Sequence, residues 1–194
     1  MSARTATKHR ETKETTVDLS LDVDGTGRAS ASTGIPFFDH MLEQLGKHAG
    51  FDLTIEATGD LEVDLHHTVE DVGIVLGSAL KEALGEKDGV RRFADAIVPL
   101  DEALVQVALD LSGRPFLVYE VDPISEWIGT FDPQLMEEFW RAFTIAAGIT
   151  LHIRSLTGKN GHHVIEASCK GVARALRDAV RVEGTGVPST KGTL

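Results

Sequence analysis

The chain has 194 residues, of which 42% are hydrophobic, and a formal net charge of -11 at pH 7. This size and composition predict one compact folded unit, and the acidic balance excludes general binding to nucleic acid or an anionic membrane, whose phosphates would be repelled. No stretch approaches the roughly 18 continuous apolar residues of a membrane helix, and the N-terminus has no apolar signal core. Because Cys169 is the only cysteine, no intramolecular disulfide can form. We therefore expect a soluble, cytoplasmic protein.

The first half of the chain contains alternating and helical apolar patterns separated by turn residues. Thr15 opens a run with the period of a half-buried strand, Pro36 opens a helical pattern, and Gly50 ends it. In chain order we expect a polar, frayed segment over residues 1–14, a β-hairpin over 15–32, a helix over 36–50, a pair of strands over 51–63, and a helix over 66–85.

The second half follows the same course. It predicts strands over 101–120 with a Ser-Gly-Arg-Pro turn, a helix over 133–148, a strand over 149–156 and a helix over 162–181. The tail over 184–194 is rich in Gly, Ser and Thr, which by composition alone is typical of a disordered end. The doubled order predicts an α+β fold in which two four-stranded sheets flank a central layer of four helices.

The chain is an internal duplication of about 90 residues. The segment from Pro36 can be laid over the segment from Pro133, so that Ala49-Gly50 falls on Ala147-Gly148, and LDVDGTGR matches LDLSGR upstream with a small gap. Each half is near the lower limit of a self-sufficient domain. We expect residues 1–92 and 93–194 to be two half-repeats that pack as one compact unit.

The pattern His-His-x-x-Glu occurs in both halves, each time at the start of a predicted helix. On a helix the first His and the Glu share one face, while the second His is rotated by roughly 100°. Imidazole and carboxylate without thiolates favour Mn²⁺, Fe²⁺, Co²⁺, Ni²⁺ or Zn²⁺, so one short helix could serve two metal ions. A single copy would more often be partly exposed histidines at a helix start, but the repetition favours a metal site. The two copies are His66-His67-Thr68-Val69-Glu70 and His162-His163-Val164-Ile165-Glu166.

Two further positions join this set through the duplication. His40 lies on the helix that precedes the first pattern, and we interpret it as a metal ligand. Its counterpart in the second half is Glu138, which can also bind a metal through oxygen. His48 and His152 have no such support from the repeat.

Six motifs in the same order resemble the imidazoleglycerol-phosphate dehydratase family, over essentially the whole chain from about Arg10 to Leu194. They are FFDHML, DLHHTVEDVGI, GVRRFA with VPLDEAL, LSGRPFL, GKNGHHVIEASCK and VPSTKG. The resemblance implies a hydro-lyase of histidine biosynthesis that removes water from D-erythro-imidazole-glycerol phosphate to give imidazole-acetol phosphate. It implies two Mn²⁺ ions per active site acting on a metal-bound imidazolate, and a 24-subunit homo-oligomer whose active sites lie between subunits.

The resemblance also assigns roles to individual residues. It implies the metal ligands His40, His66, His67, Glu70, His162, His163 and Glu166, with Glu138 standing where many members carry His. It implies catalytic roles for Glu14, an acid or base, and for His66, Glu70, His162 and Glu166. Substrate contacts would come from Glu14, Gln44, His48 and Lys170, and the phosphate would be held by Arg92, Arg114, Ser189 and Lys191. The tail is then expected to bind ligand and the N-terminal segment to order against a neighbour.

Two other functions stay open from the residues themselves. A metallohydrolase could use two metals to generate hydroxide, and a metal-storing or purely structural shell would need no turnover at all. Glu14 together with the phosphate-binding residues favours the dehydratase. Ketone formation without hydrolysis of a bond, and its dependence on metal, would separate the three.

Overall fold

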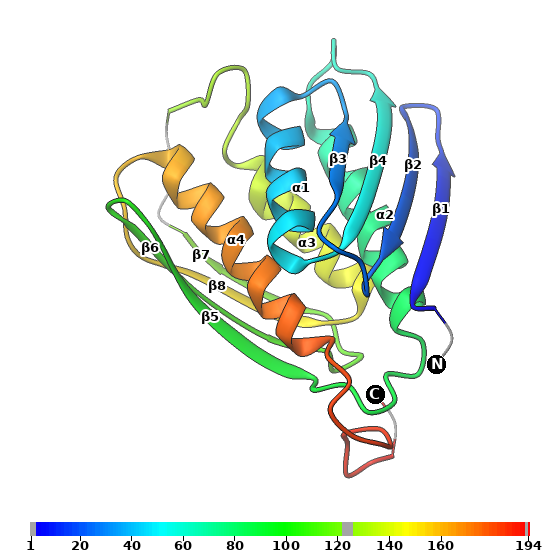
Figure 1. Cartoon of the computed structure of the whole chain (residues 1–194). Coiled ribbons are helices and arrows are strands. Elements are labelled where there is room, and N and C mark those ends of the chain that lie inside the picture. The colour runs from blue at the N-terminus through cyan, green and yellow to red at the C-terminus, as the bar shows by residue number, and fades with distance from the viewer. Residues whose placement is uncertain (1–2, 122–125, 193) are drawn as a thin grey trace.

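The computed structural model describes residues 3–121, 126–192 and 194. Its strands form two four-stranded sheets with a layer of helices between them (Figure 1). The first sheet has the order β1-β2-β4-β3, from β1 (Thr5–Glu11), β2 (Thr15–Asp22), β3 (Ala29–Ser32) and β4 (Asp52–Gly59). The second has the order β5-β6-β8-β7, from β5 (Phe93–Leu100), β6 (Ala103–Asp110), β7 (Phe116–Glu120) and β8 (Thr150–Thr157).

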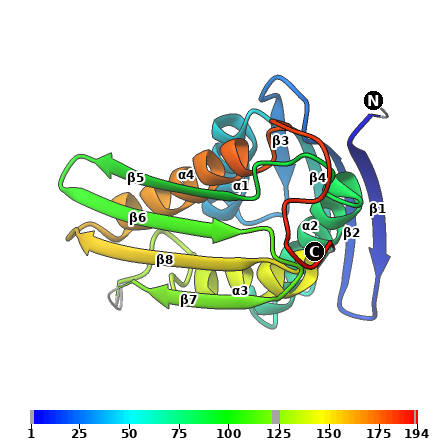
Figure 2. The same ribbon diagram turned by 90° about the horizontal axis from the view of Figure 1, so that it is seen from below.

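The pairing senses of the two sheets also agree. The first three strands in each order pair antiparallel, and the last one, β3 or β7, runs parallel to its neighbour. Figure 2 shows the second sheet from below, with its strands side by side and the C-terminal tail at the end of the sheet where β6 stops. The expected duplicated α+β fold with two four-stranded sheets is confirmed.

The helices pack in two pairs between the sheets. They are α1 (Pro36–Ala49), α2 (His66–Leu84), α3 (Leu135–Ala147) and α4 (Gly161–Ala179). Helix α1 lies against α4, and α2 lies against α3, while α2 also contacts β1 and β2 and α4 contacts β5 and β6. Aromatic side chains fill the space between the helices, including the fully buried Phe38, Phe139 and Trp140. This packing fixes where the functional helices begin.

Two expected strand pairings are wrong. Strands β2 and β3 do not form a hairpin: β2 pairs with β1 and β4, and β3 pairs with β4 after the chain has passed through α1. The expected strand pair over 51–63 is the single strand β4 followed by turns. Alternation of apolar and polar residues marks a strand but does not identify its partner, so these pairings required the tertiary structure.

Two segments became strands against expectation. The polar N-terminus pairs with β2 and forms β1 rather than a frayed end. Beside the buried Ala6, its inward Lys8 and Arg10 pair with Glu82 and Asp71 on α2. Strand β5 was not expected, since apolar residues occupy both of its faces and hide the alternation. One edge strand of each sheet, β1 in the first and β5 in the second, was therefore missed by sequence patterning.

Candidate active site

The seam between α1 and α4 holds a cluster of three candidate metal ligands. His40 comes from α1, and His162 and Glu166 come from the first turns of α4, where the i and i+4 spacing places both on one face. His162 Nε2 lies 2.9 Å from Glu166 Oε2, and His40 Nε2 lies 3.6 Å from the same oxygen. One donor atom from each residue lies within 4.8 Å of the others. These three residues could therefore bind one metal ion of the kind that imidazole ligands prefer, such as a divalent first-row metal.

Three more expected site residues continue this seam. Lys170 Nζ lies 2.6 Å from Glu166 Oε1, and His48 Nε2 lies 3.1 Å from Gln44 Oε1. Burial opposes ionisation of Glu166, but the hydrogen bonds from Lys170 and His162 hold its pKa below the ordinary value. Burial, with Lys170 and Arg174 nearby, lowers the pKa of His48. The seam therefore favours the ionised form of Glu166 and the neutral form of His48.

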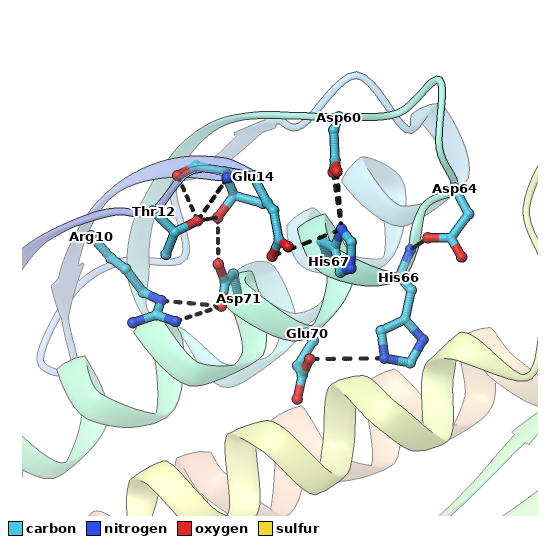
Figure 3. A network of polar contacts seen from close by, with 10 residues as sticks. Arg10, Thr12, Glu14, Asp60, Asp64, His66, His67, Glu70 and Asp71 are labelled. Carbon is cyan, nitrogen blue, oxygen red and sulfur yellow. Dashed lines mark hydrogen bonds and ion pairs between the residues drawn. The ribbon is translucent and has the colours of Figure 1, made fainter.

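The first His-His-x-x-Glu motif begins α2 and gathers different partners (Figure 3). His66 Nε2 lies 3.8 Å from Glu70, in the i and i+4 arrangement expected on one helix face. His67 points the other way, and its Nδ1 lies 3.1 Å from Asp60 and 3.9 Å from Glu14. The hydrogen bond to Asp60 raises the pKa of His67. Glu14 thus lies beside a candidate metal ligand, in the short turn between β1 and β2.

The second histidine of each motif is held by a carboxylate from outside the motif. His163 Nδ1 lies 2.8 Å from Glu102 Oε2, as His67 Nδ1 lies beside Asp60. The interaction with His163 and backbone hydrogen bonds lower the pKa of Glu102 to about 2. A carboxylate on Nδ1 orients the ring and leaves Nε2 for a metal. The sequence analysis did not predict Asp60 or Glu102 as site residues, although both stand in recognisable segments, Gly59-Asp60 and DEAL.

Glu138 occupies the place on α3 that His40 occupies on α1. Each lies ten residues before the left-handed glycine that ends its helix, Gly50 or Gly148. Glu138 instead pairs with Arg141 on its own helix at 3.4 Å, and Glu137 pairs with the same guanidinium at 2.5 Å. Among the described residues, the structure does not bring Glu138 into a ligand cluster with His66 and Glu70.

The four expected phosphate-binding residues line one pocket of about 520 Å³, together with Pro188 and Thr190; they are Arg92, Arg114, Ser189 and Lys191. Arg92 Nε donates to Asp110 at 2.7 Å and its Nη1 donates to the Pro188 carbonyl at 2.7 Å, which ties the tail to β6. The side chain of Arg114 is 65% exposed. The tail therefore forms one wall of this cationic pocket.

The cluster of candidate ligands and the cationic pocket lie at opposite ends of α4. His162 and Glu166 are in its first turns, whereas the Arg92 backbone N–H donates to the carbonyl of Ala179 at its last residue. At about 1.5 Å per residue, the stretch from Glu166 to Ala179 spans about 20 Å. Figure 1 shows α4 running toward the C-terminal tail. One small molecule cannot reach both groups in a single chain.

Comparison with known proteins decides the family. Residues 33–176 match the family model described as imidazoleglycerol-phosphate dehydratase. The chain belongs to this family. A curated imidazoleglycerol-phosphate dehydratase from Acidothermus cellulolyticus is 60% identical over 98% of this chain and 93% of its own length, and one from Parafrankia sp. is 59% identical over 99% and 100%.

Solved structures of the family share the fold. The imidazoleglycerol-phosphate dehydratase of Staphylococcus aureus has 38% sequence identity and a TM-score of 0.84, covering 92% of this chain and 99% of its own. The structure from Pyrococcus furiosus has 40% identity and the same TM-score, covering 96% and 100%. A chain of this family is an enzyme, a hydro-lyase that dehydrates imidazoleglycerol phosphate in histidine biosynthesis. In the described part of the chain, no helix is long and apolar enough to cross a membrane.

Proposed function

We propose that this dehydratase is metal-dependent, converting D-erythro-imidazole-glycerol phosphate to imidazole-acetol phosphate with two Mn²⁺ ions per active site. The observation that carries the proposal is the cluster of His40, His162 and Glu166, whose donor atoms lie within 4.8 Å of one another. The donor set fits the group: imidazole nitrogens with one carboxylate, and no thiolate among them, suit divalent first-row metals.

The remaining ligands would come from the first His-His-x-x-Glu motif and from the second histidine of each motif. His66 and Glu70, joined by Glu138 on the neighbouring α3, would repeat the arrangement of the α1–α4 seam. His67 and His163, with Nδ1 held by Asp60 and Glu102, would each offer Nε2 to a metal. When bound, the metals would act as Lewis acids that draw negative charge from the substrate imidazole.

The chain's own residues would position the substrate and move protons. Glu14 lies 3.9 Å from His67 and has a side chain that is 55% exposed, so it can reach a substrate atom near the metal ligands as an acid or base. Lys170, Gln44 and His48 extend from the seam as polar contacts for the glycerol hydroxyls. Removal of a carbon-bound proton and loss of hydroxide give an enol, which tautomerises to the ketone.

The cationic pocket would hold the substrate phosphate. Arg114 and Arg92 offer guanidinium donors, while Ser189 and Lys191 add a hydroxyl and an ammonium. Arg92 already binds Asp110 and Pro188, so its main effect is to fix the pocket wall, and the exposed Arg114 and Lys191 are freer to bind the anion.

The active site would be completed between subunits of a homo-oligomer, for which we propose the 24-subunit shell. The substrate has only a three-carbon chain between ring and phosphate, which is far shorter than the about 20 Å between the two groups along α4. Residues from a second chain would therefore join each phosphate pocket to a ligand cluster, as closed symmetric assemblies allow.

We also place the enzyme in the cytoplasm. Cys169 is buried, and burial raises the pKa of its thiol, so this cysteine is an inert core residue rather than a disulfide or redox group. A single unoxidised cysteine is consistent with a reducing compartment.

Chelation tests the metal proposal directly. Exhaustive chelation should abolish formation of the ketone product, and added Mn²⁺ should restore it, whereas the redialysed control with metal present should keep its rate. Full dehydration by protein shown to be metal-free would contradict the proposal. Phosphate release in place of the ketone would instead indicate the hydrolase, and metal binding without turnover would indicate storage.

A further inference from the structure

A stripe of cationic side chains runs along α4, in a chain whose net charge is -11. Its members are separated by four, three and four residues, and a helix with about 3.6 residues per turn keeps such positions on one face. Like charges at these intervals repel each other and destabilise a helix. The stripe consists of Lys170, Arg174 and Arg177 on the helix and Arg181 just beyond its end.

The duplicated helix α2 shows that the fold does not require this stripe. Aligning the two His-His-x-x-Glu motifs places the three helical positions of the stripe on Ile74, Ser78 and Lys81. One of these three residues is a cation, and α2 has the same length of 19 residues as α4. A stable helix in this place therefore needs no row of positive charges.

Helix α1 adds another cation beside the end of the stripe. It lies against α4, and the two helices end on the same side of the molecule (Figure 1). Lys47, in the last turn of α1, lines one pocket together with Arg177 and Arg181. At the equivalent place in α3, three residues before the closing glycine, stands the apolar Ile145. The cations therefore gather at one of two equivalent helix pairs.

This pocket has a volume of about 630 Å³, and its charged lining residues are mainly cations. Asp24 also lines it, but Arg4 Nε lies 2.9 Å from the Asp24 carboxylate and balances that negative charge. A second hollow of about 490 Å³ shares two arginines with the pocket and adds Arg174. We call the cations around the two hollows the cationic seam; they are Lys47, Arg174, Arg177 and Arg181.

Three cations of the seam have no acidic partner. Within residues 3–121, 126–192 and 194, no carboxylate oxygen lies within 4.0 Å of a side-chain nitrogen of Lys47, Arg174 or Arg177. Arg181, by contrast, lies 3.9 Å from Asp178 and also pairs with a glutamate. The charges of the three unpaired side chains are therefore available to an anion.

Capping of α4 does not account for the unpaired arginines. Basic side chains near the end of a helix commonly donate to its last carbonyls. Here those carbonyls already have other donors, because Arg4 Nη1 donates to Val180 at 2.6 Å and the Arg92 backbone N–H donates to Ala179. The unpaired arginines of the seam make no such hydrogen bond to any described residue.

The cationic seam is separate from both groups of the proposed active site. Its pocket shares no lining residue with the pocket of Arg114 and Ser189. At about 1.5 Å per residue, the stretch of α4 from Glu166 to Arg177 spans about 16 Å. A small molecule bound at the seam would therefore contact neither the cluster of candidate metal ligands nor the proposed phosphate pocket.

We propose that the cationic seam is a second anion-binding site, which takes a small phosphate-bearing molecule outside the active site. Guanidinium groups bind phosphate oxygens in pairs, and an ammonium group adds a point charge. The arginines of α4 and Lys47 of α1 hold the anion from two sides. The pocket volume of about 630 Å³ is that of a small-molecule site.

Calorimetric titration of the metal-loaded enzyme with inorganic phosphate, after free metal has been removed, tests this site. Arg114→Ala weakens the proposed substrate-phosphate pocket, so that the remaining binding reports on the seam. In that background, Arg177→Glu and, separately, Lys47→Glu each reverse one charge of the seam. Lys81→Glu makes the same charge change at the place of Arg177 on α2 and is the matched control. Circular dichroism and light scattering check the fold and the assembled mass of each variant.

The proposal requires phosphate binding that survives Arg114→Ala, weakens about 10- to 100-fold with Arg177→Glu or Lys47→Glu, and is unchanged with Lys81→Glu. With Arg114 intact, Arg177→Glu should leave kcat unchanged. Loss of all phosphate binding with Arg114→Ala alone would overturn the second site, and binding unaffected by either seam substitution would place the ion elsewhere. An equal loss with Lys81→Glu would reduce the effect to net charge, and a loss seen only when the assembled mass also falls would attribute it to the subunit contact; either result would overturn the site.

Discussion

Glu138 is the residue at which the two halves differ most at the candidate metal sites. It takes the place of His40, yet in the single chain it pairs with Arg141 rather than with His66 and Glu70. If it binds metal in the assembled enzyme, Glu138→Gln should lower the metal content by about one ion per site and reduce turnover severely. Metal analysis and kinetics on the variant measure both quantities.

Glu137 provides the matched control for that substitution. It binds the same Arg141 guanidinium but does not correspond to His40. Glu137→Gln should keep metal content and activity, with stability changed by about 0.5 kcal/mol or less. Wild-type metal content in Glu138→Gln would remove Glu138 from the ligand set.

Glu102 is expected to set the tautomer of His163. Its Oε1 accepts the backbone N–H groups of Lys159 and Asn160, and its Oε2 lies 2.8 Å from His163 Nδ1. Glu102→Gln keeps the backbone contacts but turns an amide donor toward Nδ1, so the proton moves to Nε2. Metal affinity should fall by about 10- to 100-fold with the fold unchanged.

Titration calorimetry with Mn²⁺ and ¹⁵N NMR of the imidazole rings would follow that change. Glu56→Gln, on the outer face of β4, removes the same charge away from any histidine contact and should leave affinity unchanged. An unaltered His163 tautomer in Glu102→Gln would show that Glu102 serves only the loop before α4.

Residue-level prediction succeeded where the chemistry is local. His66 with Glu70, and His162 with Glu166, are set by the helix period, so their proximity could be read from spacing. Asp60 and Glu102 were missed because each reaches its histidine from another segment. Glu102 lies far from His163 along the chain, and no local pattern links them.

At the scale of elements, the packing of α2 on α3 depends on two glycines. A Cβ at Gly77 would lie 2.4 Å from the Phe143 carbonyl oxygen, and one at Gly73 would lie 2.7 Å from that of Phe139. Gly77→Ala should force the helices apart and lower the free energy of unfolding by about 1 to 3 kcal/mol. Chemical denaturation would measure this, with Gly184→Ala, where nothing lies within 4 Å, as a control that changes little.

The C-terminal tail differs most from what its composition predicts: composition is typical of a disordered end, whereas in the structure the tail forms one wall of a pocket. Its Pro188 carbonyl accepts a hydrogen bond from Arg92, and Ser189 and Lys191 line the proposed phosphate pocket. A chain ending at Pro188 should fold but bind substrate about 10- to 100-fold more weakly, since charged hydrogen bonds to phosphate are lost. Steady-state kinetics would measure the weaker binding as a higher KM. An unchanged KM would show that the tail does not bind substrate.

Element prediction was strongest for helices. Pro36 and Gly50 delimit α1 as the start and stop signals indicate, because capping and helix period are properties of adjacent residues. Strand partners could not be predicted, since β3 joins β4 only after α1 intervenes. Edge strand β1 was hidden because its inward Lys8 and Arg10 find acidic partners on α2 instead of a hydrophobic core.

At the scale of the whole molecule, a single chain carries the parts of the proposed active site without joining them. The motifs predicted metal ligands and a phosphate pocket, but their separation along α4 became visible only in the fold. Helix length converts sequence distance into a physical distance of about 20 Å. The proposal of a second chain follows from that distance rather than from any motif.

Metal should therefore promote assembly. If His67 and His163 face outward to metals completed by a neighbour, the assembled form binds Mn²⁺ more tightly than the single chain, and mass action shifts the protein toward assembly as metal is added. Light scattering during chelation and Mn²⁺ readdition should show a reversible fall and rise in mass at low protein concentration. Ca²⁺, which prefers more oxygen ligands than these histidines offer, is the matched control and should not restore the mass. An assembled mass that is identical with and without metal at every concentration would separate the subunit contact from the metal site, whereas a monomer in both conditions would remove the shared active site altogether.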